Sequence, residues 1–161
     1  MPWQHVSNWP PELIAIHAVQ LYNGKVVMWG LGERGRDRFC KAWILDLLSW
    51  QFTQVNCTVN NVFCAGHAMM TDGRVLVAGG TDAQQRDDGE GWGTRYATVL
   101  VPDATPAGAH WEEVRSMGPT VPEYGRWYPT VTLLADERVL VVTGTQKYVR
   151  PRRTYNKKVQ L

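Results

Sequence analysis

Three cysteines, Cys40, Cys57 and Cys64, are the residues of this chain that are best suited to redox or metal chemistry. A thiol can pair as a disulfide, and as a thiolate it can bind a metal ion or attack an electrophile. The odd number leaves at least one cysteine without a disulfide partner in the chain. Their spacing matches no zinc-binding pattern, and Cys40 and Cys57 are expected to be buried apolar residues, the usual fate of a free cysteine.

Cys64 lies in the segment NVFCAGHAMM, between an aromatic residue and a glycine turn. A second segment, GRWYPT, contains Trp127 and Tyr128. A tyrosine phenol can bind a metal ion once the metal has lowered its pKa. Taken alone, however, Cys64 is most simply interpreted as a buried free thiol.

Four histidines are further candidates for metal binding or proton transfer. His17 and His67 lie at the starts of strand-like apolar runs, and we expect them to be structural histidines with satisfied hydrogen bonds. His5 and His110 are expected to be exposed.

The elements that must position these residues repeat along the chain. Each repeat has an apolar strand, a tight turn, a basic residue, a second apolar strand and a glycine, in residues 16–30, 66–80 and 129–144. Asn23-Gly24 and Asp72-Gly73 predict hairpins with type I′ turns, in which both central residues have positive φ. Glu137 occupies the glycine position of the third turn, which predicts another turn type or a strained backbone.

The first two repeats continue in the same way, through a variable loop, a third strand, an aspartate and a strand that bears a tryptophan. The aspartate and tryptophan are Asp46 with Trp50 and then Asp103 with Trp111. Each unit therefore predicts a four-stranded antiparallel sheet. Because blades of kelch-type propellers repeat at about 50 residues, we predict an all-β protein, a partial kelch-type β-propeller with about two and a half blades.

The predicted blades cover residues 11–56 and 61–116, with a truncated blade at 121–161. The polar loop at residues 81–95 accounts for the longer interval between the second and third repeats. Since propellers usually have about 4 to 8 blades, we expect residues 1–161 to form a single incomplete domain, with the remaining propeller blades absent from this chain.

The composition fits a globular all-β chain, with 44% hydrophobic and 20% charged residues, eight Trp and fifteen Gly. No apolar run reaches the ~20 residues of a membrane helix, so we predict no membrane span. The first residues lack the basic and apolar regions of a signal peptide. Residues 147–161 carry six of the 17 basic residues and no acidic one. This run aligns with a loop and a third strand, which favours a solvated structural segment over a nucleic-acid contact.

The segments NVFCAGH and GRWYPT, with the repeat DGRVLVAGG, resemble the galactose oxidase and glyoxal oxidase family of copper radical oxidases. The resemblance covers roughly residues 11–161, and it is closer to the glyoxal oxidases. It implies a seven-bladed kelch-like propeller as the parent fold. The paired cysteine and tyrosine segments are far more specific than the hairpin repeats, which any kelch protein has.

The resemblance implies that Cys64 and Tyr128 are the catalytic residues, joined by a thioether, and that Tyr128 binds copper and is oxidised to a radical. Equivalent positions in neighbouring blades lie close together around a propeller axis, which allows the two residues to meet. The implied parent enzyme oxidises a primary alcohol or aldehyde, or a carbohydrate, with O₂ and releases H₂O₂. It is expected to be secreted or in the cell envelope.

Further roles follow from the same resemblance. The ring that stacks on the modified tyrosine in galactose oxidase corresponds to Gln146, and Trp127 and Tyr124 are candidates for lining the site. The other copper ligands, two histidines and a second tyrosine, come from the C-terminal part of the family. We therefore expect the parent to be an enzyme and the isolated chain to be inactive.

An alternative function is a non-catalytic kelch-type module that binds a glycan or a protein. Trp92, in the Gly-rich acidic loop at 81–95, could stack on a sugar. The pairing of Cys64 with Tyr128 discriminates between the two hypotheses, because a pure scaffold has no need for that pair.

Overall fold

The structure is a computed structural model that describes residues 8–30, 39–82, 92–119 and 124–146. These residues form antiparallel β-sheets and short 3₁₀ segments, with no α-helix among them. None of the described segments forms a helix that is long and apolar enough to span a membrane.

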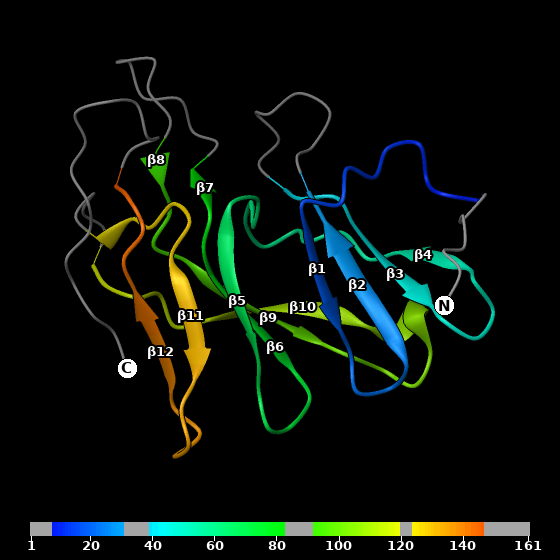
Figure 1. The fold of residues 1–161 in the computed structure, drawn as a ribbon. Coiled ribbons are helices and arrows are strands. Elements are labelled where there is room, and N and C mark those ends of the chain that lie inside the picture. The colour runs from blue at the N-terminus through cyan, green and yellow to red at the C-terminus, as the bar shows by residue number, and fades with distance from the viewer. Residues whose placement is uncertain (1–7, 31–38, 83–91, 120–123, 147–161) are drawn as a thin grey trace, which may run out of the picture.

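Two four-stranded sheets and a hairpin lie side by side (Figure 1). The first sheet contains, in spatial order, β1 (His17–Gln20), β2 (Lys25–Trp29), β3 (Ala42–Asp46) and β4 (Phe52–Gln54). The second contains β5 (Ala65–Met69), β6 (Val75–Gly79), β9 (Ala97–Val101) and β10 (His110–Val114). The hairpin contains β11 (Thr130–Leu133) and β12 (Val139–Val142). Repeated antiparallel sheets of this kind confirm the predicted all-β, partial propeller fold.

Short elements complete the second unit. Strands β7 (Thr81–Asp82) and β8 (Trp92–Gly93) pair with each other, and η1 (Pro106–Gly108) connects β9 to β10. The loop predicted at 81–95 thus begins and ends in a two-stranded ladder, while its central residues 83–91 lie outside the described part of the chain.

The three hairpin turns have the same geometry. Each loop is closed by a hydrogen bond from the N–H before it to the carbonyl after it, in the pairs Leu21–Lys25, Met70–Arg74 and Leu134–Arg138. Only the third residue of each loop has a positive φ, 74° at Gly24, 84° at Gly73 and 68° at Glu137. The type I′ prediction is therefore wrong, because a three-residue loop needs a left-handed residue only at its last position.

The main core lies between the first and second sheets. The side chains of Trp29 and Val77 are fully buried there, together with Cys40 and Cys57, whose burial was predicted. Trp111 of β10 reaches across to the first sheet and donates from Nε1 to the carbonyl oxygen of Val55 at 2.6 Å. This hydrogen bond and the apolar burial hold the two sheets together.

The tryptophan predicted in the fourth strand of the first unit lies elsewhere. Trp50 is 42% exposed and has a φ of 57°, in the turn before β4. The turn is built by Asp46, whose side chain accepts hydrogen bonds from the N–H groups of Leu48 and Ser49. Only Trp111 therefore takes the predicted strand position.

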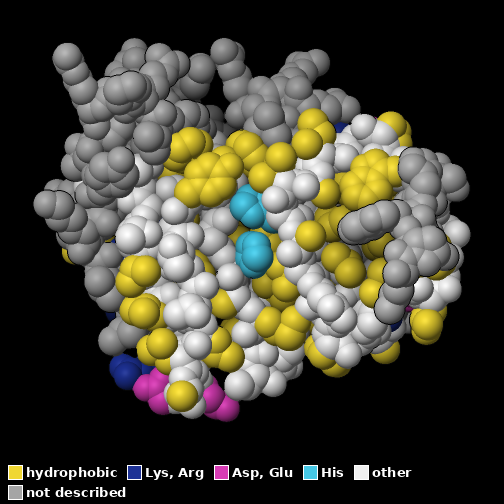
Figure 2. Space-filling model, in the orientation of Figure 1, with side chains coloured by type: hydrophobic (Ala, Val, Ile, Leu, Met, Phe, Trp, Pro, Cys, Tyr) yellow, Lys and Arg dark blue, Asp and Glu magenta, His cyan; other side chains and the backbone are white. Residues whose placement is uncertain are grey.

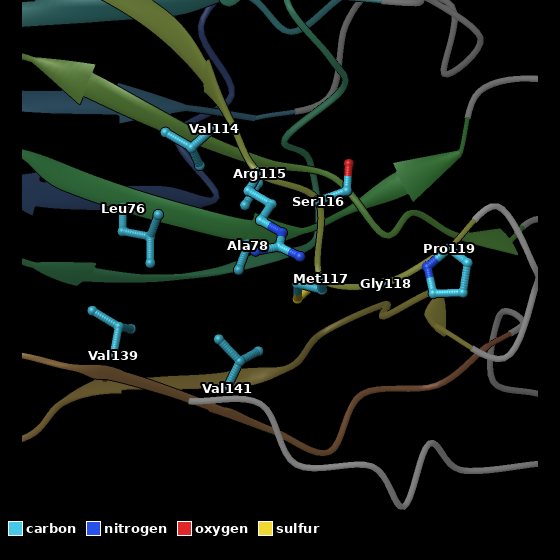
Figure 3. A pocket seen from close by; sticks show the side chains of 11 residues that line it. Leu76, Ala78, Val114, Arg115, Ser116, Met117, Gly118, Pro119, Val139 and Val141 are labelled. Carbon is cyan, nitrogen blue, oxygen red and sulfur yellow. The ribbon is translucent and has the colours of Figure 1, made fainter.

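A groove of about 770 Å³ separates the second sheet from the hairpin (Figure 3). Apolar side chains of β6 and β12 face each other across it, and the segment after β10 lines one end. The lining residues include Leu76, Ala78, Val139, Val141 and Met117. None of the site residues predicted from the sequence lines this groove.

Candidate functional site

Cys64 is the residue that immediately precedes β5. It is 1% exposed and has a φ of 62°, in the left-handed region that side-chain-bearing residues rarely adopt. Its N–H donates to Nε2 of His17 at 3.2 Å, and its carbonyl accepts from the N–H of Tyr128 at 2.7 Å. Neighbouring elements on both sides therefore maintain this strained conformation.

Tyr128 is positioned by a short extended segment between the second sheet and the hairpin. Isolated β-bridges join Arg126 to Thr94 and Trp127 to Thr145. Arg126 is fully buried and donates from Nη1 to the carbonyl oxygen of Thr143. Tyr128 follows with a φ of 53°, and its side chain is 48% exposed. The tyrosine therefore lies at the surface, while the backbone just before it is held by the two bridges.

Glycines allow this segment to approach the second sheet. A Cβ at Gly66 would lie 2.4 Å from the carbonyl oxygen of Pro129, and one at Gly79 would lie 2.4 Å from that of Arg126. Both distances are too short for any side chain. The glycines of the CAG and AGG motifs are thus needed where the backbone before β11 crosses β5 and β6.

The side chains of Cys64 and Tyr128, predicted to meet, do lie together. A hydrogen-bond interaction with the Cys64 side chain is the main reason, ahead of burial, why the pKa of Tyr128 is raised to about 12. Burial raises the pKa of the Cys64 thiol, against hydrogen bonds with the side chains of Tyr128, Thr81 and Trp127. Both groups are therefore protonated at neutral pH.

Two histidines lie beside this pair, and sequence reasoning assigned them no place in the site. The ring of His17 is 5.8 Å from that of His67 and 6.5 Å from that of Tyr128. Figure 2 shows histidine side chains together at the centre of one face, over β1 and β5. Burial, and secondarily the proximity of His67, lowers the pKa of His17 to about 4, so its ring is neutral and Nε2 can accept a hydrogen bond.

The repeats contained a signal for these histidines. His17 and His67 occupy the same position in the first two repeats, as Cys64 and Tyr128 occupy similar positions before β5 and β11. His67 is nevertheless the third residue of β5, opposite Val77, and not at a strand start as predicted. His110 is exposed as predicted and contacts Glu112, while His5 lies outside the described residues.

The three predicted lining residues have different surroundings. The ring of Trp127 lies 4.8 Å from that of Tyr128, at an interplanar angle of 68°. Gln146 accepts a hydrogen bond at its backbone carbonyl from Gly93 at 2.8 Å. Tyr124 packs over Gly118, where a Cβ would lie 2.1 Å from the tyrosine ring. Of these three, Trp127 is the residue with an observed ring contact to Tyr128.

The described residues contain no group of three or more His, Cys, Asp or Glu side chains that could hold a metal ion. What the arrangement offers is a buried thiol in contact with a half-exposed phenol, beside a neutral imidazole. Such a pair can be joined by oxidation, and the phenol can contribute one ligand to a metal.

Trp92, the residue proposed for glycan stacking, is half-buried in β8. The basic segment 147–161 lies outside the described residues.

Comparison with known proteins supports the architecture. No protein-family model and no curated protein matches the chain. Among solved structures, it is similar to a fungal alcohol oxidase of the AA5 family, determined in complex with copper. The TM-score is 0.58 at 16% sequence identity, and the match covers 87% of this chain but 28% of the oxidase. The chain therefore has the fold of about a quarter of a copper-containing alcohol oxidase.

Proposed function

We propose that this chain is the part of a copper radical oxidase that carries the cysteine–tyrosine cofactor. The parent oxidises a primary alcohol or aldehyde with O₂ and releases H₂O₂. The observation that carries the proposal is the contact between Cys64 and Tyr128, in a fold shared with a copper-containing alcohol oxidase. Both residues have left-handed backbone, a strain that is often maintained at functional sites.

The chemistry of the proposed cofactor is a two-electron oxidation of the two side chains. A bond forms between the Cys64 sulfur and a ring carbon of Tyr128, and the S–H and ring C–H bonds break. Two protons and two electrons pass to O₂, which becomes H₂O₂. Sulfur bonded next to the phenol oxygen donates electron density to the ring and makes the phenol easier to oxidise.

In this proposal Tyr128 is the copper ligand that this part of the chain contributes, and the described residues contain no cluster of three or more histidine, cysteine or carboxylate ligands. When bound, copper would accept one electron and favour the phenolate form of the tyrosine. The other ligands in the proposal come from outside the described residues. What this chain does is hold the phenol beside the Cys64 thiol, with the N–H of Tyr128 donating to the carbonyl of Cys64.

The proposal is tested by the intact mass of the parent protein, which contains this chain together with the other copper ligands, after incubation with Cu(II) and O₂. We expect the loss of two hydrogen atoms, resistant to dithiothreitol, which distinguishes a thioether from a disulfide. Cys64→Ala and Tyr128→Phe should abolish the loss, and Cys40→Ala is the matched control that should retain it. An unchanged wild-type mass would contradict the proposal and favour the non-catalytic kelch-type binding module.

A further inference from the structure

The backbone just before β5 is held by side chains from two different sheets. Three side chains of other elements hydrogen-bond to it: Trp29 Nε1 donates to the carbonyl of Val62 at 3.1 Å, Thr81 Oγ1 donates to the carbonyl of Phe63 at 3.0 Å, and His17 Nε2 accepts from the N–H of Cys64 at 3.2 Å. Two of the three therefore come from the first sheet, although the segment belongs to the second.

His17 is itself rigidly placed. Its ring stacks on that of Trp29 at 5.1 Å, with an interplanar angle of 15°, and meets His67 edge-on at 5.8 Å. The residue is 8% exposed and starts β1, where its backbone is opposite Trp29. A stacked and buried imidazole has little rotational freedom, so Nε2 is a fixed hydrogen-bond acceptor.

The two hydrogen bonds of Cys64 act on opposite sides of its Cα. The N–H is held by His17 of the first sheet, and the carbonyl is held by the N–H of Tyr128. With φ at 62°, the direction of the Cα–Cβ bond depends on both bonds. Removal of the acceptor on the N–H side leaves a buried donor unpaired and allows the backbone to relax from the left-handed region.

We propose that His17 is a positioning residue, which holds Cys64 in the left-handed conformation that directs its sulfur at the ring of Tyr128. The inference rests on the proposed function, because positioning matters for the reaction between these two side chains. His17 takes no part in the transfer itself. The electrons and protons leave from the thiol and the phenol ring, and the imidazole contacts the backbone of Cys64.

The test compares His17→Phe, which keeps a flat ring against Trp29 but no acceptor, with His17→Gln, which restores an acceptor. In the parent protein with Cu(II) and O₂, we expect His17→Phe to slow the loss of two hydrogens at least tenfold and His17→Gln to recover part of the rate. His67→Phe is the matched control, because among the described residues His67 packs against the rings of His17 and Trp29 but makes no hydrogen bond to Cys64. A wild-type rate in His17→Phe would overturn the proposal.

Two readouts do not depend on copper. Alkylation by iodoacetamide should become faster at Cys64 in His17→Phe but stay slow at Cys40 and Cys57, whereas general loosening would expose all three. In the wild-type chain, the Cys64 amide should be protected from hydrogen exchange, and rapid exchange there would refute the inference even if no variant folds. If the wild type forms no thioether while these readouts hold, the proposed function fails and the positioning stands.

Discussion

At the scale of single residues, the site depends on a phenol and a thiol that perturb each other. Tyr128 is half-exposed, and its interaction with the Cys64 side chain raises the pKa of the phenol to about 12. Binding of a metal to this phenol must therefore displace a proton that is held more tightly than in free tyrosine. The thiol thus has an effect on the phenol before any bond forms between them.

This coupling predicts the titration of Tyr128. In Cys64→Ala, the pKa of Tyr128 should fall from about 12 toward its ordinary value of 10.0, because the hydrogen bond with the thiol is the largest cause of the shift. The absorbance of the phenolate near 295 nm, measured against pH with Tyr128→Phe as the reference, isolates this residue. A Tyr128 that titrates unchanged in Cys64→Ala would show that burial alone sets its pKa.

At the scale of elements, the three hairpins share a loop geometry but not a loop sequence. The second and third loops also share an aspartate–arginine pair. Asp72 accepts from the backbone N–H and the side chain of Arg74, and Asp136 does the same with Arg138. Glu137, however, takes a φ of 68° where the other loops have glycine. The third hairpin therefore retains backbone strain that the other two avoid.

The strain predicts a stabilising substitution. Glu137→Gly should raise the free energy of unfolding by about 1 kcal/mol, because glycine adopts a positive φ without the Cβ clash. Denaturation by urea, followed by tryptophan fluorescence, measures the change. Gly24→Ala is the matched control, since no atom lies within 4 Å of its added Cβ and only the backbone penalty of its 74° φ remains. Destabilisation by Glu137→Gly would show that its side chain has a compensating role.

At the scale of the whole molecule, a buried and a half-buried neutral histidine lie where the first sheet meets the second. Burial lowers the pKa of both His17 and His67, and for His17 the value is about 4, against an ordinary value of 6.5. Above pH 6.5 these rings are neutral in the folded and the unfolded chain. As the pH falls from 6.5 toward 4, the unfolded chain takes up protons that the folded chain does not, so folding loses free energy.

We therefore predict that the stability falls over this pH window, with His17 contributing of the order of 2 kcal/mol. Urea denaturation at several pH values between 4 and 7 checks it, and His17→Phe should flatten the dependence. The exposed His110 has a raised pKa and acts in the opposite direction. The aspartates Asp46, Asp72, Asp103 and Asp136 have lowered pKa values and titrate below this window. Equal stability at pH 4 and pH 7 would contradict the assignment of a buried neutral His17.

Much of this fold was predictable because its pattern is local. Apolar alternation and turn residues within about 15 positions predict a hairpin, and their repetition predicts blades. The prediction of type I′ turns was wrong although turn geometry is also local, because it depends on loop length. The three-residue loops required a left-handed residue at one position instead of two. Trp50 lies outside the predicted strand because the hydrogen bonds accepted by Asp46 form a turn before β4.

The sequence by itself determined the strands, their order into repeated sheets, and the two segments that contain Cys64 and Tyr128. Only the tertiary structure decided which other side chains accompany them. His17 is separated from Cys64 by 47 positions and bonds to its N–H because packing of the first sheet on the second sets their register. Contacts within a blade follow from short-range sequence patterns, whereas contacts between blades depend on how whole sheets pack, which no short pattern specifies.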